Sequence, residues 1–244
     1  PMQGPFTYQY VGGNQHRHLP LNKGHDTWYN RPELFHTILS SSGEIKVIGQ
    51  GDSSVVPPIV AGEILTLTST DMCVSVDGTG EKVYLGVNSA TDYITRCNLD
   101  GSDPEVIYPG LGSLTIKGIA VEPSAGKVWW CDSSADEIQR GDMDGSGPVE
   151  VIIDIDPTGQ TPVDICLDPG NRKLYYTDDQ TGAECVRHAS MDPPSPSFAP
   201  AVLISTPGQE LIGIDIDIPR QRLYYCTKDE GIYRFPWHLT LLLN

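Results

Sequence analysis

Positively charged residues are scarce in this sequence. Its 244 residues include 16 Lys and Arg against 32 Asp and Glu, which gives a formal net charge of −16 at pH 7. A field of this sign repels phosphate backbones and anionic lipid headgroups. No apolar run is long enough to span a bilayer as a helix. We therefore expect neither nucleic acid nor a membrane as partner, and either a solvated surface or a cationic partner explains the charge.

The sequence also lacks the motifs that mark common enzyme classes. It has no glycine-rich nucleotide loop, no Gly-x-Ser-x-Gly elbow and no His-Glu-x-x-His zinc motif. Its Asp-Gly turns do not have the ligand spacing of calcium loops. We therefore expect neither a resident metal ion nor a cofactor.

What the sequence does contain is one pattern repeated four times. An apolar segment ends in an acid, and a second segment, rich in aromatic residues, opens with a base: KVYLGV (82–87), KVWWCD (127–132), KLYYTD (173–178) and RLYYCT (222–227). Acid and base are five residues apart in every copy, at 77/82, 122/127, 168/173 and 217/222. An Ile-x-Arg-like segment follows, and its basic residues recur at 96, 140, 188 and 234. Four strands in each such period predict a β-propeller.

These segments resemble the YWTD repeats of low-density-lipoprotein-receptor-type propellers, over about residues 70–237. No copy spells Tyr-Trp-Thr-Asp, and Val87 and Thr227 replace the final Asp of the first and last copies. The resemblance implies a propeller fold. It also implies that Asp132 and Asp178, which end the motif in the other two copies, tie neighbouring blades together by hydrogen bonds.

We expect a single all-β domain over residues 1–244, a propeller of four-stranded antiparallel blades. Length favours five blades, with six as the alternative if a degenerate sheet borrows the N-terminal segment. The expected blades span residues 1–49, 63–108, 114–153, 161–205 and 210–244, with 50–62 as an inserted loop or strand. His36 is placed in the Ile-x-Arg column. The apolar segment 238–244 would either close the last blade or contact a second copy, so the oligomeric state stays open.

The six cysteines indicate a compartment. Cys131 and Cys226 occupy one repeat column, and equivalent positions in a ring are too far apart for a disulfide. No Cys-x-x-Cys pair and no Asn-x-Ser/Thr sequon occurs. We therefore expect reduced, buried thiols and a cytoplasmic protein. No signal peptide is visible, although one already removed would leave no trace.

The segment before residue 37 carries four of the six histidines. His16 and His18 would lie on one face of a strand and could bind a metal, but we favour a polar loop with scattered histidines. Lys117, Asp164 and Lys228 fall near loops that share one mouth of a propeller. The predicted catalytic groups are His25, Asp26, Lys117 and Asp164, and the predicted ligand-binding groups are His16, His18, Trp28, Tyr29 and Lys228.

Two functions from different classes fit these residues. The first is a cofactor-independent enzyme that holds a hydrophobic small molecule over the channel mouth, as a cyclase or lyase of a natural-product pathway would. The second is a non-catalytic module that binds a protein segment or a glycan on the propeller face. A deep, dry pocket with a perturbed ionisable group favours the enzyme, and an exposed apolar patch at the mouth favours the module.

Overall fold

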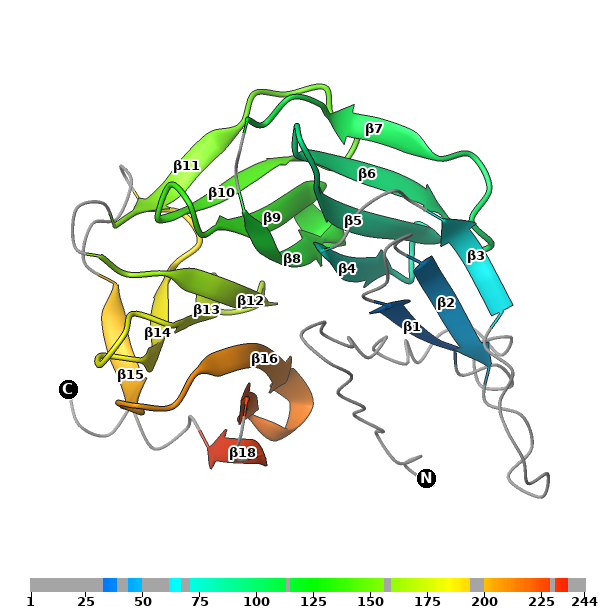
Figure 1. The fold of residues 1–244 in the computed structure, drawn as a ribbon. Coiled ribbons are helices and arrows are strands. Elements are labelled where there is room, and N and C mark those ends of the chain that lie inside the picture. Colours follow the sequence, from blue (N-terminus) through cyan, green and yellow to red (C-terminus); the bar gives the residue numbers. More distant parts are fainter. Residues whose placement is uncertain are drawn as a thin grey trace, which may run out of the picture.

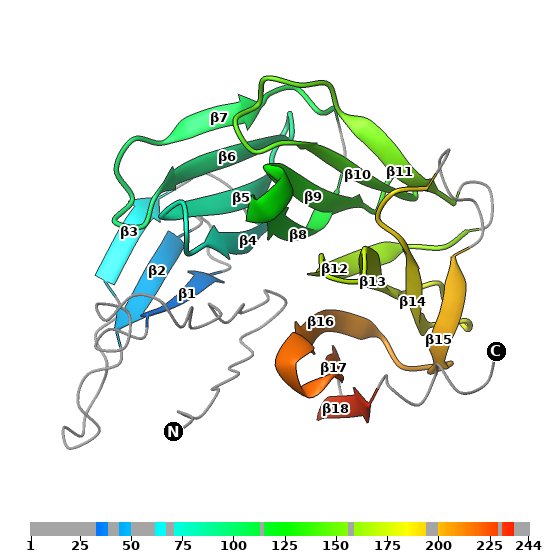
Figure 2. The same ribbon diagram turned by 180° about the vertical axis from the view of Figure 1, so that it is seen from behind.

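The computed structural model describes residues 33–38, 44–49, 62–66, 71–112, 115–155, 159–193, 200–228 and 231–236. In these residues the chain forms eighteen strands and two short 3-10 helices. The strands make five antiparallel sheets that follow one another around a common centre (Figures 1 and 2). This arrangement confirms the predicted all-β propeller with four-stranded antiparallel blades.

Each sheet is a simple meander, and its strands are counted here outward from the centre. The first sheet contains β1 (Glu33–Ile38), β2 (Glu44–Gly49) and β3 (Gly62–Thr66). The second contains β4 (Asp71–Asp77), β5 (Lys82–Asn88), β6 (Tyr93–Asn98) and β7 (Glu105–Tyr108). The third contains β8 (Ile116–Glu122), β9 (Lys127–Asp132), β10 (Glu137–Asp142) and β11 (Glu150–Asp154).

The fourth sheet contains β12 (Pro162–Asp168), β13 (Lys173–Asp178), β14 (Cys185–Ser190) and β15 (Ala201–Ser205). The fifth contains β16 (Leu211–Asp217), β17 (Arg222–Thr227) and β18 (Gly231–Pro236). The short helices η1 (Pro123–Ala125) and η2 (Ile218–Arg220) lie in the turns between the first and second strands of the third and fifth sheets.

The constant gap of five residues between acid and base has a local cause. In all four copies the acid and the base are the closing pair of a first-to-second-strand hairpin. The residue just before the base is left-handed in every copy, at Glu81, Gly126, Arg172 and Gln221. Asp77 shows what the acid does, because its Oδ1 accepts from the backbone N–H of Thr79 and of Gly80, both at 2.9 Å. One four-residue turn therefore fixes the spacing.

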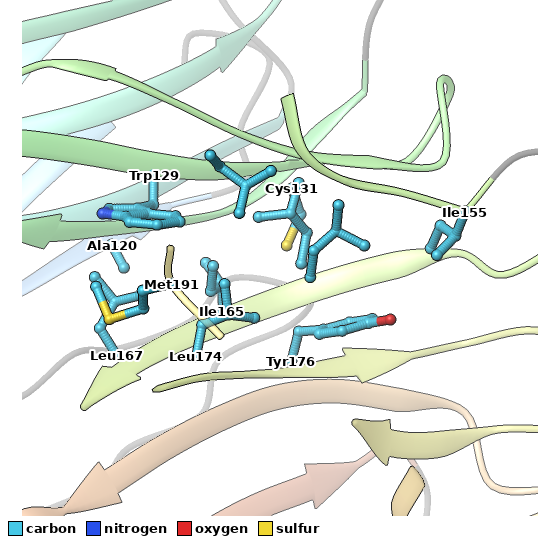
Figure 3. Close-up of a cluster of buried hydrophobic side chains, with 12 residues drawn as sticks. Ala120, Trp129, Cys131, Ile155, Ile165, Leu167, Leu174, Tyr176 and Met191 are labelled. Carbon is cyan, nitrogen blue, oxygen red and sulfur yellow. The ribbon is translucent and has the colours of Figure 1, made fainter. Parts of the chain in front are cut away.

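The core lies between neighbouring blades, which explains why the second strands read as unbroken apolar runs. Side chains alternate across a strand, so Trp129 and Cys131 of β9 face the fourth sheet, where they pack with Ile165 and Tyr176 (Figure 3). Trp130, between them, faces the second sheet and packs with residues of β4 and β5. Burying both faces of a strand leaves it no polar side.

The first strands line the centre and approach one another closely (Figure 1). Gly118 of β8 shows how closely, since a Cβ there would lie 2.6 Å from Asp164 Cα and 2.7 Å from the Val163 carbonyl oxygen. Both neighbours are backbone atoms of β12, which cannot turn away as a side chain would. Glycine at this position is therefore required by the packing of two blades.

The first sheet corrects one assignment made from the sequence. We placed His36 in the third-strand column, with Arg96. In the other blades, the second strand contacts the first strand of the next blade, as β5 contacts β8, β9 contacts β12 and β13 contacts β16. β1 contacts β4 in the same way. Thus β1 is a second strand, and His36 lies opposite Lys46 just as Tyr84 lies opposite Arg96. Lys46 holds the basic column, and the step from residue 46 to residue 96 is 50 residues. The irregular step of 60 from residue 36 disappears.

Some predicted blade boundaries differ from those in the structure, and others lie outside the described residues. The first sheet extends to Thr66 and the second begins at Asp71, where the sequence had suggested residue 63. Of the predicted insertion 50–62, residues 50–61 lie outside the described residues, as does the closing segment 238–244, and residue 62 begins β3. All six cysteines are free, and five of them are buried. The expected buried thiols are therefore confirmed for all except Cys226, which is half-buried.

Candidate interaction surface at the propeller mouth

The mouth of the propeller consists of the loops before the first strands and after the second strands. At the end of three second strands, β5, β9 and β13, one polar side chain reaches the entrance of the next blade. Asn88 donates to and accepts from the backbone of Ile116 at 2.9 and 2.8 Å. Ser133 donates to the carbonyl of Pro162, and Asp179 accepts from the first N–H of β16 at 3.2 Å. These three equivalent side chains therefore join the second sheet to the third, the third to the fourth and the fourth to the fifth at the mouth.

Asp132 and Asp178, one residue earlier, act differently from what the resemblance implied. Asp132 Oδ1 accepts from the backbone N–H of Ser134 and of Ala135, both at 3.0 Å, and so shapes its own loop. Asp178 accepts from Thr161 N at 2.9 Å within its own sheet and pairs with Arg187 Nε at 2.6 Å. The motif aspartates thus stiffen their own blade, and the residues that follow them join the blades.

Asp164, a predicted catalytic group, is buried between first strands. Its side chain is 1% exposed. Oδ1 accepts from Ile165 N and Oδ2 accepts from Ile214 N of the next blade, both at 2.8 Å. Its own N–H donates to Thr177 Oγ1 at 3.0 Å. The carboxylate thus joins the fourth and fifth blades from within the protein.

Lys117 and Lys228, by contrast, lie at the mouth and are exposed. Lys228 Nζ pairs with Glu210 Oε2 at 2.8 Å. Lys117 acts electrostatically on Asp179, which is also influenced by Glu210. The structure therefore places the two predicted lysines beside the neighbouring carboxylates of Asp179 and Glu210, whereas Asp164 lies buried. The catalytic and ligand-binding roles of these three residues stay predictions.

Carboxylates dominate the mouth beside these lysines. We call the following six residues the acidic rim: Asp132, Glu137 and Asp154 on the third sheet, and Asp179, Glu184 and Glu210 on the fourth and fifth. Glu137 lies directly opposite Asp154 across β10 and β11, a pairing of like charges that destabilises a sheet. Lys117 and Lys228 lie beside the second half of the rim only.

Three rim residues have raised pKa values, whereas backbone hydrogen bonds from Gly208 and Gly182 lower the pKa of Glu184. Burial raises the pKa of Glu137, and the carboxylates of Asp154 and Asp132 add to the shift. Burial likewise raises the pKa of Asp132. The pKa of Asp179 is raised by burial and by Glu210, against the opposing effects of a backbone hydrogen bond and Lys117. A cation placed among these groups would therefore be stabilised.

The predicted N-terminal site lies beyond the described residues. This holds for the candidate catalytic and ligand-binding residues of that segment, namely His16, His18, His25, Asp26, Trp28 and Tyr29. Within the ranges that the structure describes, no group of three or more His, Cys, Asp or Glu side chains is arranged to hold a metal ion. The same ranges contain no helix long and apolar enough to cross a membrane.

Solved structures share this architecture. A chain in the crystal structure of a nidogen/laminin complex superposes with a TM-score of 0.68 at 23% identity, over 83% of this chain and 74% of that one. Putative TolB from Agrobacterium tumefaciens superposes with a TM-score of 0.58 at 15% identity, over 81% of this chain and 66% of that one. Both likenesses concern the fold.

Sequence comparisons identify the repeats. No family model matches the chain. A Pyricularia oryzae protein named low-density lipoprotein receptor-related protein 1 is 41% identical over 61 residues, 24% of this chain and 19% of that protein. The repeats are of the YWTD type. Protein cueball of Drosophila erecta is 25% identical over 122 residues, 50% of this chain and 18% of its own length. The chain thus spans less than a fifth of the curated relatives it matches.

Proposed function

We propose that this YWTD-type propeller is a non-catalytic interaction module that binds a protein segment at its mouth. The observation that carries the proposal is the fold match to a chain from a nidogen/laminin complex, a propeller seen together with a protein partner. Two ionisable groups at the described mouth are already engaged, which favours this role over catalysis. Asp164 is buried, and Lys228 is paired with Glu210.

The acidic rim indicates the chemistry of the partner segment. Burial raises the pKa values of Glu137 and Asp179, and neighbouring carboxylates add to both shifts, so each group is less stable as an anion than it would be in water. A segment rich in Lys and Arg would relieve this repulsion and gain steering from a net charge of −16. We therefore propose a cationic segment as the ligand.

The enzyme hypothesis has less support in the same structure. A catalyst for a hydrophobic molecule needs a dry pocket with a reactive group exposed to it. The exposed large apolar side chains are Val106, Val149, Val202, Ile218 and Ile232. They are spread over outer strands and turns of different blades and form no apolar patch at the described mouth. No comparison points to a cyclase, a lyase or a small-molecule substrate.

A peptide-binding experiment tests the proposal. The probes are random short peptides that contain Lys and Arg, with matched peptides in which Gln replaces these residues. We expect binding of the cationic set alone, weakening as salt is added. A rim variant, Glu137→Gln/Asp154→Asn/Glu210→Gln, should lose binding. The control is Asp100→Asn/Asp103→Asn/Asp144→Asn, which removes the same charge from exposed turns at the opposite end.

The outcomes separate the hypotheses. Equal loss in both variants would mean that net charge alone attracts the peptides, and equal binding of the Gln peptides would refute a cationic ligand. If neither peptide set binds while a small molecule from native-host extract remains with the purified protein, the enzyme hypothesis is favoured.

The number of blades and the compartment are part of the same proposal. We propose five blades, because the described sheets already number five, and a crystal structure of the whole chain would count them. We propose a reducing compartment such as the cytoplasm, because all six thiols are free. A tagged full-length protein found in the secretory pathway would contradict it.

A further inference from the structure

In the second and third sheets a fourth-strand glutamate pairs with the third-strand arginine of its own blade, and in the third sheet also with the lysine of the second strand. Glu150 of β11 contacts Arg140 Nη2 at 2.9 Å and Lys127 Nζ at 3.4 Å. Glu105 of β7 contacts Arg96 Nη2 at 2.9 Å in the same way. Each arginine also donates to a carbonyl of the following blade, at 2.8 Å from Arg96 and 3.0 Å from Arg140. An internal carboxylate therefore neutralises these bases.

The fourth sheet keeps the lysine but loses the groups that neutralise it. The strand registers place Lys173 where the third sheet has Lys127, and His188 where it has Arg140. The same registers place Ser190 in place of Asp142, and Ala201 in place of Glu150. The lysine thus faces a hydroxyl, and both the glutamate and the arginine are replaced by smaller residues.

These replacements coincide with a pocket of about 390 Å³. Lys173, His188 and Ser190 give it a polar side, and Pro193, Pro200 and Ala201 give it an apolar side. Arg172 also lines it but is already engaged, with Asp192 Oδ2 at 2.6 Å and with Glu122. Among the described residues no carboxylate pairs with Lys173.

We propose that this pocket binds the carboxylate of an external ligand, in the place that the Glu150 carboxylate takes in the third sheet. Lys173 Nζ would supply the charge-assisted hydrogen bond, and Ser190 and His188 would donate further hydrogen bonds. The apolar wall would accommodate a short carbon chain attached to the carboxylate.

The surroundings favour a singly charged group. Arg172 is balanced by Glu122 and Asp192, so Lys173 supplies the positive charge that is left for a ligand. Burial and Lys173 lower the pKa of His188, so its imidazole is neutral near pH 7 and adds a donor without a second charge. A carboxylate matches this single charge better than a phosphate, which carries up to two.

Butyrate and its uncharged analogue butyramide test the proposal by NMR titration of the isotope-labelled protein. We expect butyrate to shift the amide signals of Lys173, His188 and Ser190 saturably, and butyramide to leave them unchanged. Lys173→Met should weaken binding by about tenfold or more, the effect of losing one charged hydrogen bond. Lys173→Arg keeps the charge and should retain binding.

Refilling the pocket from within gives an independent readout. Ala201→Glu restores the residue of the third sheet and should abolish butyrate binding while raising Tm above that of Ala201→Gln, which fills the same space without charge. An N-acetylated dipeptide with a free C-terminus tells whether the carboxylate may also come from a polypeptide. Equal shifts with butyramide, or full binding by Lys173→Met, would overturn the proposal. The mouth plays no part in either result, so failure here leaves the proposed function untouched.

Discussion

Asp164 offers the sharpest test of how the blades are joined. In Asp164→Ala, the backbone N–H groups of Ile165 and Ile214 lose their 2.8 Å acceptor. The site is 1% exposed, so water cannot readily replace the carboxylate. Each buried donor left unsatisfied costs about 1–3 kcal/mol. We therefore expect the free energy of unfolding to fall by about 3–4 kcal/mol, near the middle of the summed range.

The assay is urea unfolding followed by tryptophan fluorescence, since Trp129 and Trp130 are fully buried. For a chain of this length a loss of 1 kcal/mol lowers Tm by about 2–4 °C, so the alanine variant should melt about 10 °C lower. Asp164→Asn keeps one acceptor oxygen and should lose about half as much. The control is Glu210→Gln, which breaks an exposed ion pair on the same face and should cost less than about 1 kcal/mol.

One result would refute this reasoning. If Asp164→Ala unfolds at the same urea concentration as Glu210→Gln, the carboxylate contributes nothing to blade cohesion.

Three further predictions follow from the described contacts. Gly118→Ala puts a Cβ 2.6 Å from a backbone atom of Asp164 and should destabilise the protein by about 1–3 kcal/mol in urea unfolding; an unchanged midpoint would show that the two strands can separate. Burial raises the pKa of Cys97 and that of Cys185 to about 11, so a thiol reagent at mildly alkaline pH should label them only after unfolding. Fast labelling of these two thiols in the native protein would contradict their burial. The folded-state pKa values of Asp132 and Glu137 are raised. Their contribution to stability is therefore fully present below about pH 4 and is lost as the pH rises through the folded-state pKa values. Asp154→Asn removes a like charge opposite Glu137 and should make this loss of stability with pH smaller in urea unfolding, and a larger loss would refute the reasoning.

The repeat pattern predicted the fold well because it is set by local chemistry. A capped four-residue turn holds the acid and the base five residues apart, so the ends of the first and second strands could be placed from spacing alone. Alternation across β9 buries Trp129 toward one blade and Trp130 toward the other, and the apolar run KVWWCD shows it. These features need no knowledge of distant contacts.

Register between distant segments was harder to predict. His36 was placed in the third-strand column because a Ser-Ser-Gly turn (41–43) and an apolar segment (44–48) follow it, as a turn and a strand follow the Ile-x-Arg segments. The structure assigns that column to Lys46 through strand pairing. The residues that join the blades were not identified from the sequence either. Asn88, Ser133 and Asp179 occupy equivalent positions at the ends of their second strands, but their side chains differ in chemistry. Only the fold shows that each meets the entrance of the next blade.

The candidate site was predicted in part. Proximity of Lys117 and Lys228 to one mouth followed from the strand order, and the structure places both beside rim acids. Burial of Asp164 did not follow, because its fit depends on Gly118 in the preceding blade and on Ile214 in the next. The pocket at Lys173 was missed, although the sequence carried the signal, namely His188 in an arginine column.

Hydrogen–deuterium exchange of the protein with and without a bound cationic peptide tests the central claim most directly. We predict that slowed exchange is confined to the mouth loops, at residues 133–136, 179–184 and 206–210, and that it is absent in the variant with the neutralised rim. Slowed exchange in the turns at the opposite end, around residues 99–104 and 143–149, would contradict an interaction surface at the mouth.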